Sequence, residues 1–274
     1  MGAKITAIEY VFPNRKITND DLVKQFPDYD FSRFEEKVGI KNRYWVDNDE
    51  TALSLAKSAC NKLFKRIDKK SIDYILYCTQ SPEYFLPTTA CILQNELGLR
   101  NNIGALDFNL GCSGYTYGLS LAKGLLNDTN VKNILLVTSE TYSKYIHPMD
   151  KSNLAIFGDA ATATLISFCE DDNFGDFLYG TDGSGFDKLI VKNGAGKHKF
   201  YAEEELKQYG NDNMFTDNNL YMNGPDVFNF TLSVIPDFTL QLLEKNKIAL
   251  ENIDQVIFHQ ANKFMLNQLR KKIK

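Results

Sequence analysis

The chain has 274 residues, of which 43% are hydrophobic and 24% are charged, and its formal net charge is −4. This composition is typical of a soluble globular protein with one large or two ordinary domains. The net charge gives no indication of nucleic acid as a partner, and no apolar run reaches the length of a membrane span. The five cysteines are widely spaced and form no C-x-x-C pair, which indicates neither a disulfide framework nor a metal site. We therefore expect a reducing, cytoplasmic location.

Buried strands and amphipathic helices alternate along the first 170 residues. Apolar and β-branched runs indicate strands. These strands cover residues 5–12, 72–78, 103–110 and 133–140. Capping residues, together with apolar side chains at helical spacing, indicate helices. One helix covers residues 31–38, and others begin at the capping residues Asn19, Thr51 and Thr88. The alternation predicts an α/β sheet with helices on both faces.

A candidate nucleophile, Cys112, lies between two of these elements. The sequence Gly111-Cys112-Ser113-Gly114 follows an apolar strand and precedes a helix, which apolar side chains mark at Tyr117, Leu121 and Leu125. A sharp turn of this kind places Cys112 at a helix N-terminus, where unpaired N–H groups favour the thiolate. We therefore expect a lowered pKa and a nucleophilic role. The alternative is a buried structural cysteine, which is the commoner role of a single cysteine.

A short sequence from the first part of the chain recurs, with changes, in the second part; we call this recurrence the echo. Residues 171–222 are rich in Gly, Asp and Asn, and Pro225 suits the first turn of a long helix. The run IDYILYCTQ, residues 72–80, returns as IDQVIFHQ at residues 253–260. This echo predicts another strand at 253–260 and two similar halves, residues 1–170 and 171–274. The second half would then stop after one further helix, so we expect it to be incomplete.

Five motifs follow one another between residues 38 and 262. They are Val38-Gly39-Ile40-Lys41-Asn42-Arg43, LPTTACILQ from Leu86, NLGCSGYTYGL from Asn109, IFGDAATA from Ile156, and FHQAN from Phe258. In this order they resemble β-ketoacyl-acyl-carrier-protein synthase III, a family of thiolase-like condensing enzymes. The resemblance implies a thiolase-like α/β fold of two similar layered halves, the second incomplete here. It also implies a decarboxylative Claisen condensation.

The resemblance assigns catalytic roles to Cys112 and His259. Cys112 would take an acyl group from a coenzyme A or carrier-protein thioester. A malonyl unit on the carrier protein would then lose CO₂ and attack the acyl-cysteine. His259, in the FHQAN motif, would stabilise the charge that develops on the thioester oxygen. A histidine at a strand end is more often structural when it is considered alone.

The resemblance also indicates four residues of the substrate site. Lys37 and Lys151 align with arginines near the coenzyme A phosphates, and ordinary surface charges are an equally good interpretation. Phe228 aligns with a pocket phenylalanine but also fits the core of a helix. Asn262, in the same motif as His259, is assigned to substrate binding.

The resemblance implies substrates and binding partners, and two family motifs that are missing here leave alternative functions open. We expect acyl-coenzyme A and an acyl carrier protein as substrates, a homodimer closed by a loop like residues 84–87, and no permanently bound cofactor, metal, nucleic acid or membrane. The carrier protein would dock on a basic cluster of Lys263, Arg270, Lys271, Lys272 and Lys274. The family's G-N-T-S and G-G-G-F motifs do not follow His259. The alternatives are therefore a non-condensing acyltransferase and a catalytically inactive fragment or partner subunit.

Overall fold

The structure is a computed structural model that describes residues 2–273, and it forms two compact units of mixed α/β composition. The first unit contains the chain up to Lys16, Tyr44–Tyr142 and Asp159–Gly175. The second contains Ile17–Arg43, Ser143–Gly158 and the chain from Asp176 onward. The predicted division at residues 170 and 171 concerns repeated halves rather than compact units, and it stays a prediction.

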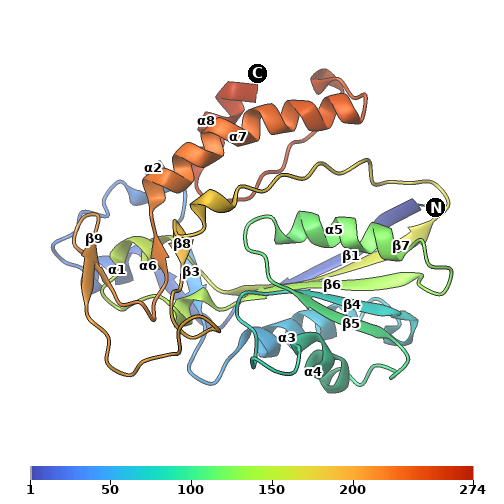
Figure 1. Cartoon of the computed structure of the whole chain (residues 1–274), viewed down its shortest axis with the longest axis horizontal. Coiled ribbons are helices and arrows are strands. Elements are labelled where there is room, and N and C mark those ends of the chain that lie inside the picture. The colour runs from blue at the N-terminus through green and yellow to red at the C-terminus, as the bar shows by residue number, and fades with distance from the viewer. Residues whose placement is uncertain (1, 274) are drawn as a thin grey trace. The chain divides into compact units, whose positions relative to one another are not determined.

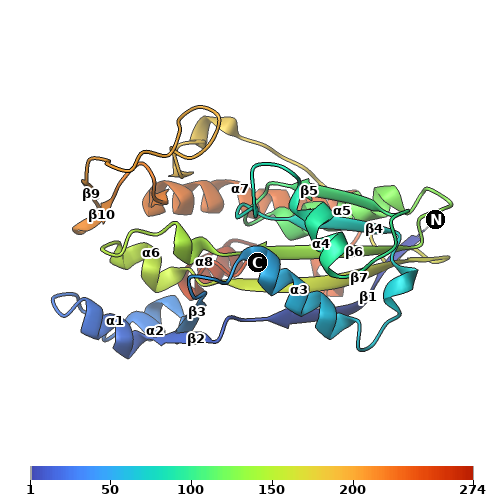
Figure 2. The same cartoon turned by 90° about the horizontal axis from the view of Figure 1, so that it is seen from below.

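A five-stranded mixed sheet forms the centre of the first unit (Figure 1). Its strands, in order across the sheet, are β1 (Gly2–Val11), β7 (Ala160–Cys169), β6 (Asn133–Glu140), β4 (Tyr74–Cys78) and β5 (Gly104–Phe108). β4 runs parallel to β5 and β6, whereas β7 is antiparallel to both of its neighbours. Figure 2 shows the strands in this order. The four strands predicted in the first 170 residues are thus confirmed.

Helices cover both faces of this sheet, as the alternating pattern predicted. α3 (Ala52–Leu63) and α4 (Thr89–Glu96) lie on one face, and α5 (Gly114–Leu125) lies on the other (Figure 1). Thr51 caps α3 as expected, because its hydroxyl accepts the backbone N–H of Ser54. Each face buries its own apolar cluster, one beneath α3 and α4 and one beneath α5.

The fully buried positions of α5 are small residues. Tyr117, Leu121 and Leu125 marked the helix in the sequence, but Leu121 is 40% exposed. The buried positions are small residues, Gly114, Gly118 and Ala122. A Cβ atom on Gly118 would lie 2.5 Å from Leu136 Cδ1, so the helix approaches the sheet more closely than larger side chains allow.

Among the described residues, the second unit contains five helices and two short two-stranded sheets. Its helices are α1 (Asn19–Gln25), α2 (Phe34–Val38), α6 (Lys151–Ile156), α7 (Gly224–Lys245) and α8 (Lys263–Ile273). Its strand pairs are β8 (Leu189–Ile190) with β11 (Tyr221–Met222) and β9 (Lys207–Tyr209) with β10 (Asn213–Phe215). Elsewhere in the chain, β2 (Arg15–Thr18) pairs with β3 (Asn42–Trp45). The 3₁₀ turns within residues 2–273 are η1 (Lys69–Ser71), η2 (Tyr142–Lys144), η3 (Gly183–Gly185) and η4 (Leu250–Asn252). Thr18, rather than the predicted Asn19, caps α1. In the described part of the chain, no helix has the length and apolar character needed to cross a bilayer.

The strand predicted at residues 253–260 is wrong. The segment between η4 and α8 is irregular, and its apolar residues Val256 and Ile257 are 47% and 76% exposed. A strand is stable only when a neighbouring backbone pairs with its N–H and C=O groups. Within residues 2–273, no strand pairs with this segment. The sequence therefore has the apolar pattern of a strand without the partner that would fix it.

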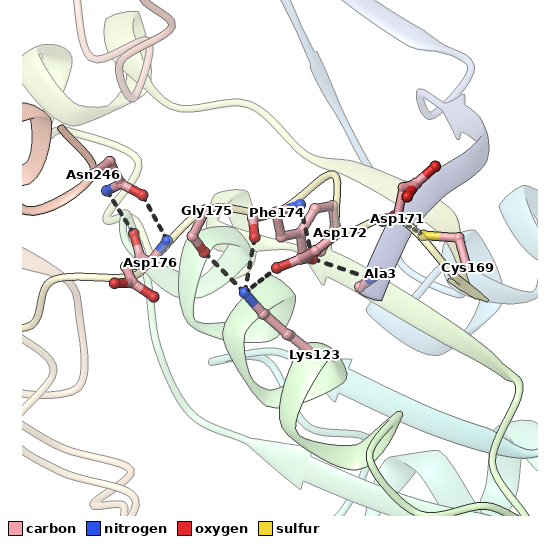
Figure 3. Close-up of polar contacts among 9 residues, drawn as sticks. All are labelled: Ala3, Lys123, Cys169, Asp171, Asp172, Phe174, Gly175, Asp176 and Asn246. Atoms are coloured by element: carbon pink, nitrogen blue, oxygen red, sulfur yellow. Dashed lines mark hydrogen bonds and ion pairs between the residues drawn. The ribbon is translucent and has the colours of Figure 1, made fainter. Parts of the chain in front are cut away.

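The chain passes from the first unit to the second between Gly175 and Asp176. On the first side, Lys123 of α5 donates to the Asp172 carboxylate at 2.6 Å and to two backbone carbonyl oxygens at 2.8 and 3.2 Å (Figure 3). On the second side, Asn246 accepts the N–H of Asp176 at 2.7 Å and donates to its carbonyl oxygen at 3.1 Å. Each side of this crossing is thus fastened within its own unit.

Candidate active site

Three segments meet at the carboxyl edge of the parallel strands in the first unit. Cys78, at the end of β4, is in register with Phe108 of β5 and with Thr138 of β6. The residues that follow these strands therefore emerge at the same edge, where α/β proteins commonly carry their functional groups. The three segments are residues 79–81, 109–113 and 140–142. Cys112 belongs to the second of them.

A tight turn carries Cys112 from β5 to α5. The N–H of Gly114 donates to the carbonyl oxygen of Gly111 at 2.9 Å, which closes the turn around Cys112 and Ser113. A Cβ atom on Gly114 would collide with Cys78 Sγ, so the turn lies directly against the end of β4. Cys112 itself is exposed. The predicted strand, turn and helix are present, and Cys112 lies at the surface of the first unit.

The expected lowering of the Cys112 pKa is wrong in direction. Although the residue is exposed, desolvation of its thiol raises the pKa of Cys112, and a backbone hydrogen bond opposes this effect only in part. The helix N-cap is Ser113, so Cys112 lies outside the first helical turn, where the dipole acts most strongly. At neutral pH, Cys112 is therefore mainly a thiol and must lose its proton in order to react.

A largely buried acid, Glu140, stands at the same edge. Its carboxylate accepts the backbone N–H of Gln80 at 2.6 Å and the hydroxyl of Ser81 at 2.9 Å. Desolvation nevertheless raises the pKa of Glu140 to about 7. Neither Glu140 nor Gln80 was predicted from the sequence. The signal that could have found them is their position at the carboxyl ends of two buried strands, with Glu140 as the last residue of β6 and Gln80 two residues beyond β4.

His259 lies in the irregular segment before α8, in the second unit. His259 is exposed, and its backbone carbonyl oxygen accepts the N–H of Ala261 at 3.0 Å. Desolvation of the imidazole lowers the pKa of His259 below its ordinary value. The ring is therefore neutral at neutral pH, with one nitrogen donating and the other accepting. A neutral imidazole of this kind can donate a hydrogen bond to an oxygen on which charge develops.

Asn262 and Phe228 both contribute to the packing of α8. The Asn262 side-chain oxygen accepts the backbone N–H of Met265 at 2.8 Å, as the cap of a helix does. Phe228 of α7 stacks on Phe264 of α8 with the ring centroids 5.5 Å apart. Both side chains thus stabilise the packing of α8 in the second unit. Their contacts with substrate stay predictions.

The two predicted phosphate ligands, Lys37 and Lys151, also lie in the second unit. Lys37 is exposed on α2, a helix that packs against α8. Lys151 begins α6, where its ammonium group lies 5.4 Å from the Tyr29 ring centroid and donates to the carbonyl oxygen of Asp212 at 3.3 Å. Cys112 is therefore the one predicted site residue that lies in the first unit. Within residues 2–273, no group of three or more His, Cys, Asp or Glu side chains could hold a metal ion.

The known proteins that this chain resembles share one family description. Residues 106–183 match the family model of 3-oxoacyl-[acyl-carrier-protein (ACP)] synthase III. A putative 3-oxoacyl-[acyl-carrier-protein] synthase 3 of Campylobacter jejuni subsp. jejuni is 35% identical over an alignment of 280 positions, which covers 99% of this chain and 78% of that protein. A β-ketoacyl-[acyl-carrier-protein] synthase III of Clostridium perfringens is 30% identical over 275 residues, with 99% of this chain and 81% of that protein covered.

Solved structures agree with these relatives. A crystal structure of a 3-oxoacyl-(acyl-carrier-protein) synthase III superposes with a TM-score of 0.95 at 43% identity, covering 100% of this chain and 82% of that one. The 3-oxoacyl-(acyl-carrier protein) synthase from Burkholderia xenovorans LB400 superposes with a TM-score of 0.87 at 34% identity, covering 100% and 77%. The predicted resemblance and the predicted fold class are both confirmed.

Proposed function

The chain belongs to the 3-oxoacyl-[acyl-carrier-protein] synthase III family, and from that membership we propose which of its residues act, and how. It is a condensing acyltransferase with a thiolase-like fold, as the sequence predicted. The relatives do not favour the non-condensing acyltransferase. The observation that carries the assignment of the site is Cys112, exposed in a tight glycine-flanked turn at the carboxyl edge of the sheet.

In the first half of the reaction, the Cys112 sulfur attacks the carbonyl carbon of an acyl-coenzyme A thioester. The new bond joins sulfur to the acyl carbon, and coenzyme A leaves as a thiol with the proton that Cys112 gives up. Because the pKa of Cys112 is raised, this proton must be removed as the bond forms. The product is an acyl-cysteine.

In the second half, a malonyl thioester of the acyl carrier protein loses CO₂. The electron pair of the broken C–C bond becomes an enolate, whose carbon attacks the acyl-cysteine and releases the Cys112 sulfur. His259 donates its N–H to the enolate oxygen, a role that its lowered pKa supports because the neutral ring carries one donor. The product is a 3-oxoacyl carrier protein.

The remaining predicted residues bind the substrates in this proposal. Lys37 and Lys151 meet the coenzyme A phosphates as point charges, while Phe228 and Asn262 border the substrate arm. The acidic carrier protein docks on the basic side chains of α8. These are Lys263, Arg270, Lys271 and Lys272, and the predicted Lys274 lies outside the described residues.

A second copy of the chain is the proposed partner of the loop at residues 84–87. Tyr84, Phe85 and Leu86 are 62%, 81% and 85% exposed, and large apolar side chains that gather in this way are typical of an interface. Sedimentation velocity of the purified chain tests this homodimer, and a monomer at all concentrations would contradict it. Cell fractionation tests the proposed cytoplasmic location.

The central experiment follows the mass of the intact chain during incubation with acetyl-coenzyme A. We expect an acetyl adduct that is absent in Cys112→Ala and retained in Cys91→Ala, a matched control at another exposed cysteine. Malonyl carrier protein is then added, and CO₂ release is measured. His259→Ala should keep the adduct and lose CO₂ release. An adduct without CO₂ release in the wild type would support the non-condensing alternative, and no adduct with any acyl thioester would support the inactive one.

A further inference from the structure

The side chain of Gln80 connects the three segments at the carboxyl edge. Its amide N–H donates to the Asn109 side-chain oxygen at 3.0 Å, and its amide oxygen accepts the hydroxyl of Tyr142. Gln80 follows β4, Asn109 follows β5 and Tyr142 follows β6. One amide group therefore joins the start of the Cys112 turn to the segments on either side of it.

The same amide also rests on the backbone next to Cys112. A Cβ atom on Gly111 would lie 2.8 Å from the Gln80 side-chain oxygen, closer than real contacts of this kind. The space that the amide occupies is thus available because residue 111 is a glycine. Gln80 and Gly111 fit against each other, and Cys112 is the next residue along the chain.

The backbone of Gln80 is itself fixed. Its N–H donates to Glu140 at 2.6 Å, and the other carboxylate oxygen of Glu140 accepts the Ser81 hydroxyl at 2.9 Å. The Ser81 oxygen accepts the N–H of Thr141 at 3.2 Å. Gln80 is therefore held from the β6 side before its amide reaches the turn, as a group that positions another must be.

We propose that Gln80 is a positioning residue, whose amide holds the Cys112 turn in the geometry that acyl transfer requires. This inference rests on the proposed role of Cys112 as the nucleophile. Without the amide, the turn keeps its bond between Gly114 and Gly111, but Asn109 at its start loses the link through Gln80 to Tyr142. The thiol then gains water contact and loses alignment with a bound thioester. Two rates should move in opposite directions: alkylation by a small reagent rises, and acylation falls.

The experiment measures both rates in the full chain by peptide mass. Gln80→Met removes both polar contacts at similar length, Tyr142→Phe removes one, and Gln241→Met is the control on the exposed part of α7. With saturating acetyl-coenzyme A, we expect Cys112 acylation to fall about tenfold or more in Gln80→Met and less in Tyr142→Phe. With iodoacetamide, we expect Cys112 alkylation to rise about threefold, because the desolvation that raises its pKa is relieved. Alkylation of the exposed Cys91 should stay constant in every variant.

Three outcomes would decide against the proposal or separate it from other causes. If both Cys112 rates in Gln80→Met stay within about twofold of the wild type, the proposal is overturned. Loss of the fold would make the buried Cys60 and Cys78 reactive, and Tyr142→Phe, which removes a single hydroxyl, then decides the question by the same two rates. If the wild-type chain forms no acyl adduct, the proposed function is wrong. In that case the alkylation rates alone test whether Gln80 positions the turn.

Discussion

Glu140 shows how burial and hydrogen bonding compete at a single residue. Desolvation raises its pKa from 4.5 to about 7, although the N–H of Gln80 and the hydroxyl of Ser81 both favour the charged form. A carboxyl group with a folded-state pKa above its unfolded value binds its proton more tightly in the folded chain. Its contribution to stability is therefore fully present below about pH 4.5 and is lost as the pH rises to about 7.

Glu140→Gln removes this titration while keeping the size of the side chain. Relative to the variant, we expect the wild type to lose roughly 2 to 3 kcal/mol of its free energy of unfolding between pH 4.5 and pH 8. Urea denaturation at a series of pH values measures this difference. Glu203→Gln, at an exposed position, is the control and should give a profile parallel to the wild type. A pH-independent difference between Glu140→Gln and the wild type would contradict the prediction.

The site could be predicted from the sequence only where its residues are contiguous. Gly111, Cys112 and Gly114 form one short motif, so the turn and its exposed cysteine were accessible to sequence reasoning. Gln80 and Glu140 come from other strands, and the parallel register of β4, β5 and β6 brings them to the same edge. The pKa of Cys112 was misjudged because the desolvation of a thiol depends on how the folded chain packs around it, which the motif does not reveal.

At the scale of elements, α4 receives its N-terminal cap from a neighbouring strand. Thr88 precedes the helix, but its side chain makes no capping hydrogen bond. Asp107 of β5 accepts the N–H groups of Thr89 at 2.6 Å and of Ala90 at 2.7 Å. The carboxylate thus pairs with the unpaired N–H groups of the first turn, and its charge opposes the positive end of the helix dipole.

Asp107→Ala should therefore lower the free energy of unfolding by about 1 to 2 kcal/mol, as the loss of a helix cap does. Thr88→Ala is the matched control, and we expect it to change the stability by less than about 0.5 kcal/mol. Urea denaturation followed by circular dichroism gives both values. Equal losses in the two variants would show that Asp107 does not act as the cap.

Some helices and strands can be predicted from the local sequence, whereas others form only if a neighbouring element pairs or packs with them. Four strands of the first unit and the start of α3 at Thr51 were predictable, because apolar periodicity and a side-chain cap are properties of the local sequence. One prediction failed for a reason of packing, because residues 253–260 have no strand beside them within the described chain.

At the scale of the whole molecule, polar contacts hold the chain on each side of its last passage between the units, at Gly175 and Asp176. The Lys123 ammonium group donates hydrogen bonds to three oxygens of residues 172–175. The side chains of Lys123 and Asp172 are both partly exposed to water. Surface ion pairs contribute little to stability when they act alone. Here the same ammonium group also binds two carbonyl oxygens, so its effect should appear as local order rather than as global stability.

Lys123→Met keeps the length of the side chain and removes all three hydrogen bonds. We expect chymotrypsin to cleave after Phe174 about threefold to tenfold faster in this variant, because proteolysis follows the population of locally opened chain. The free energy of unfolding should change by less than about 1 kcal/mol. Lys70→Met, at an exposed lysine distant in sequence, is the control. Mass spectrometry of timed digests locates the cleavage, and an unchanged rate after Phe174 would mean that the segment is held by its apolar contacts rather than by Lys123.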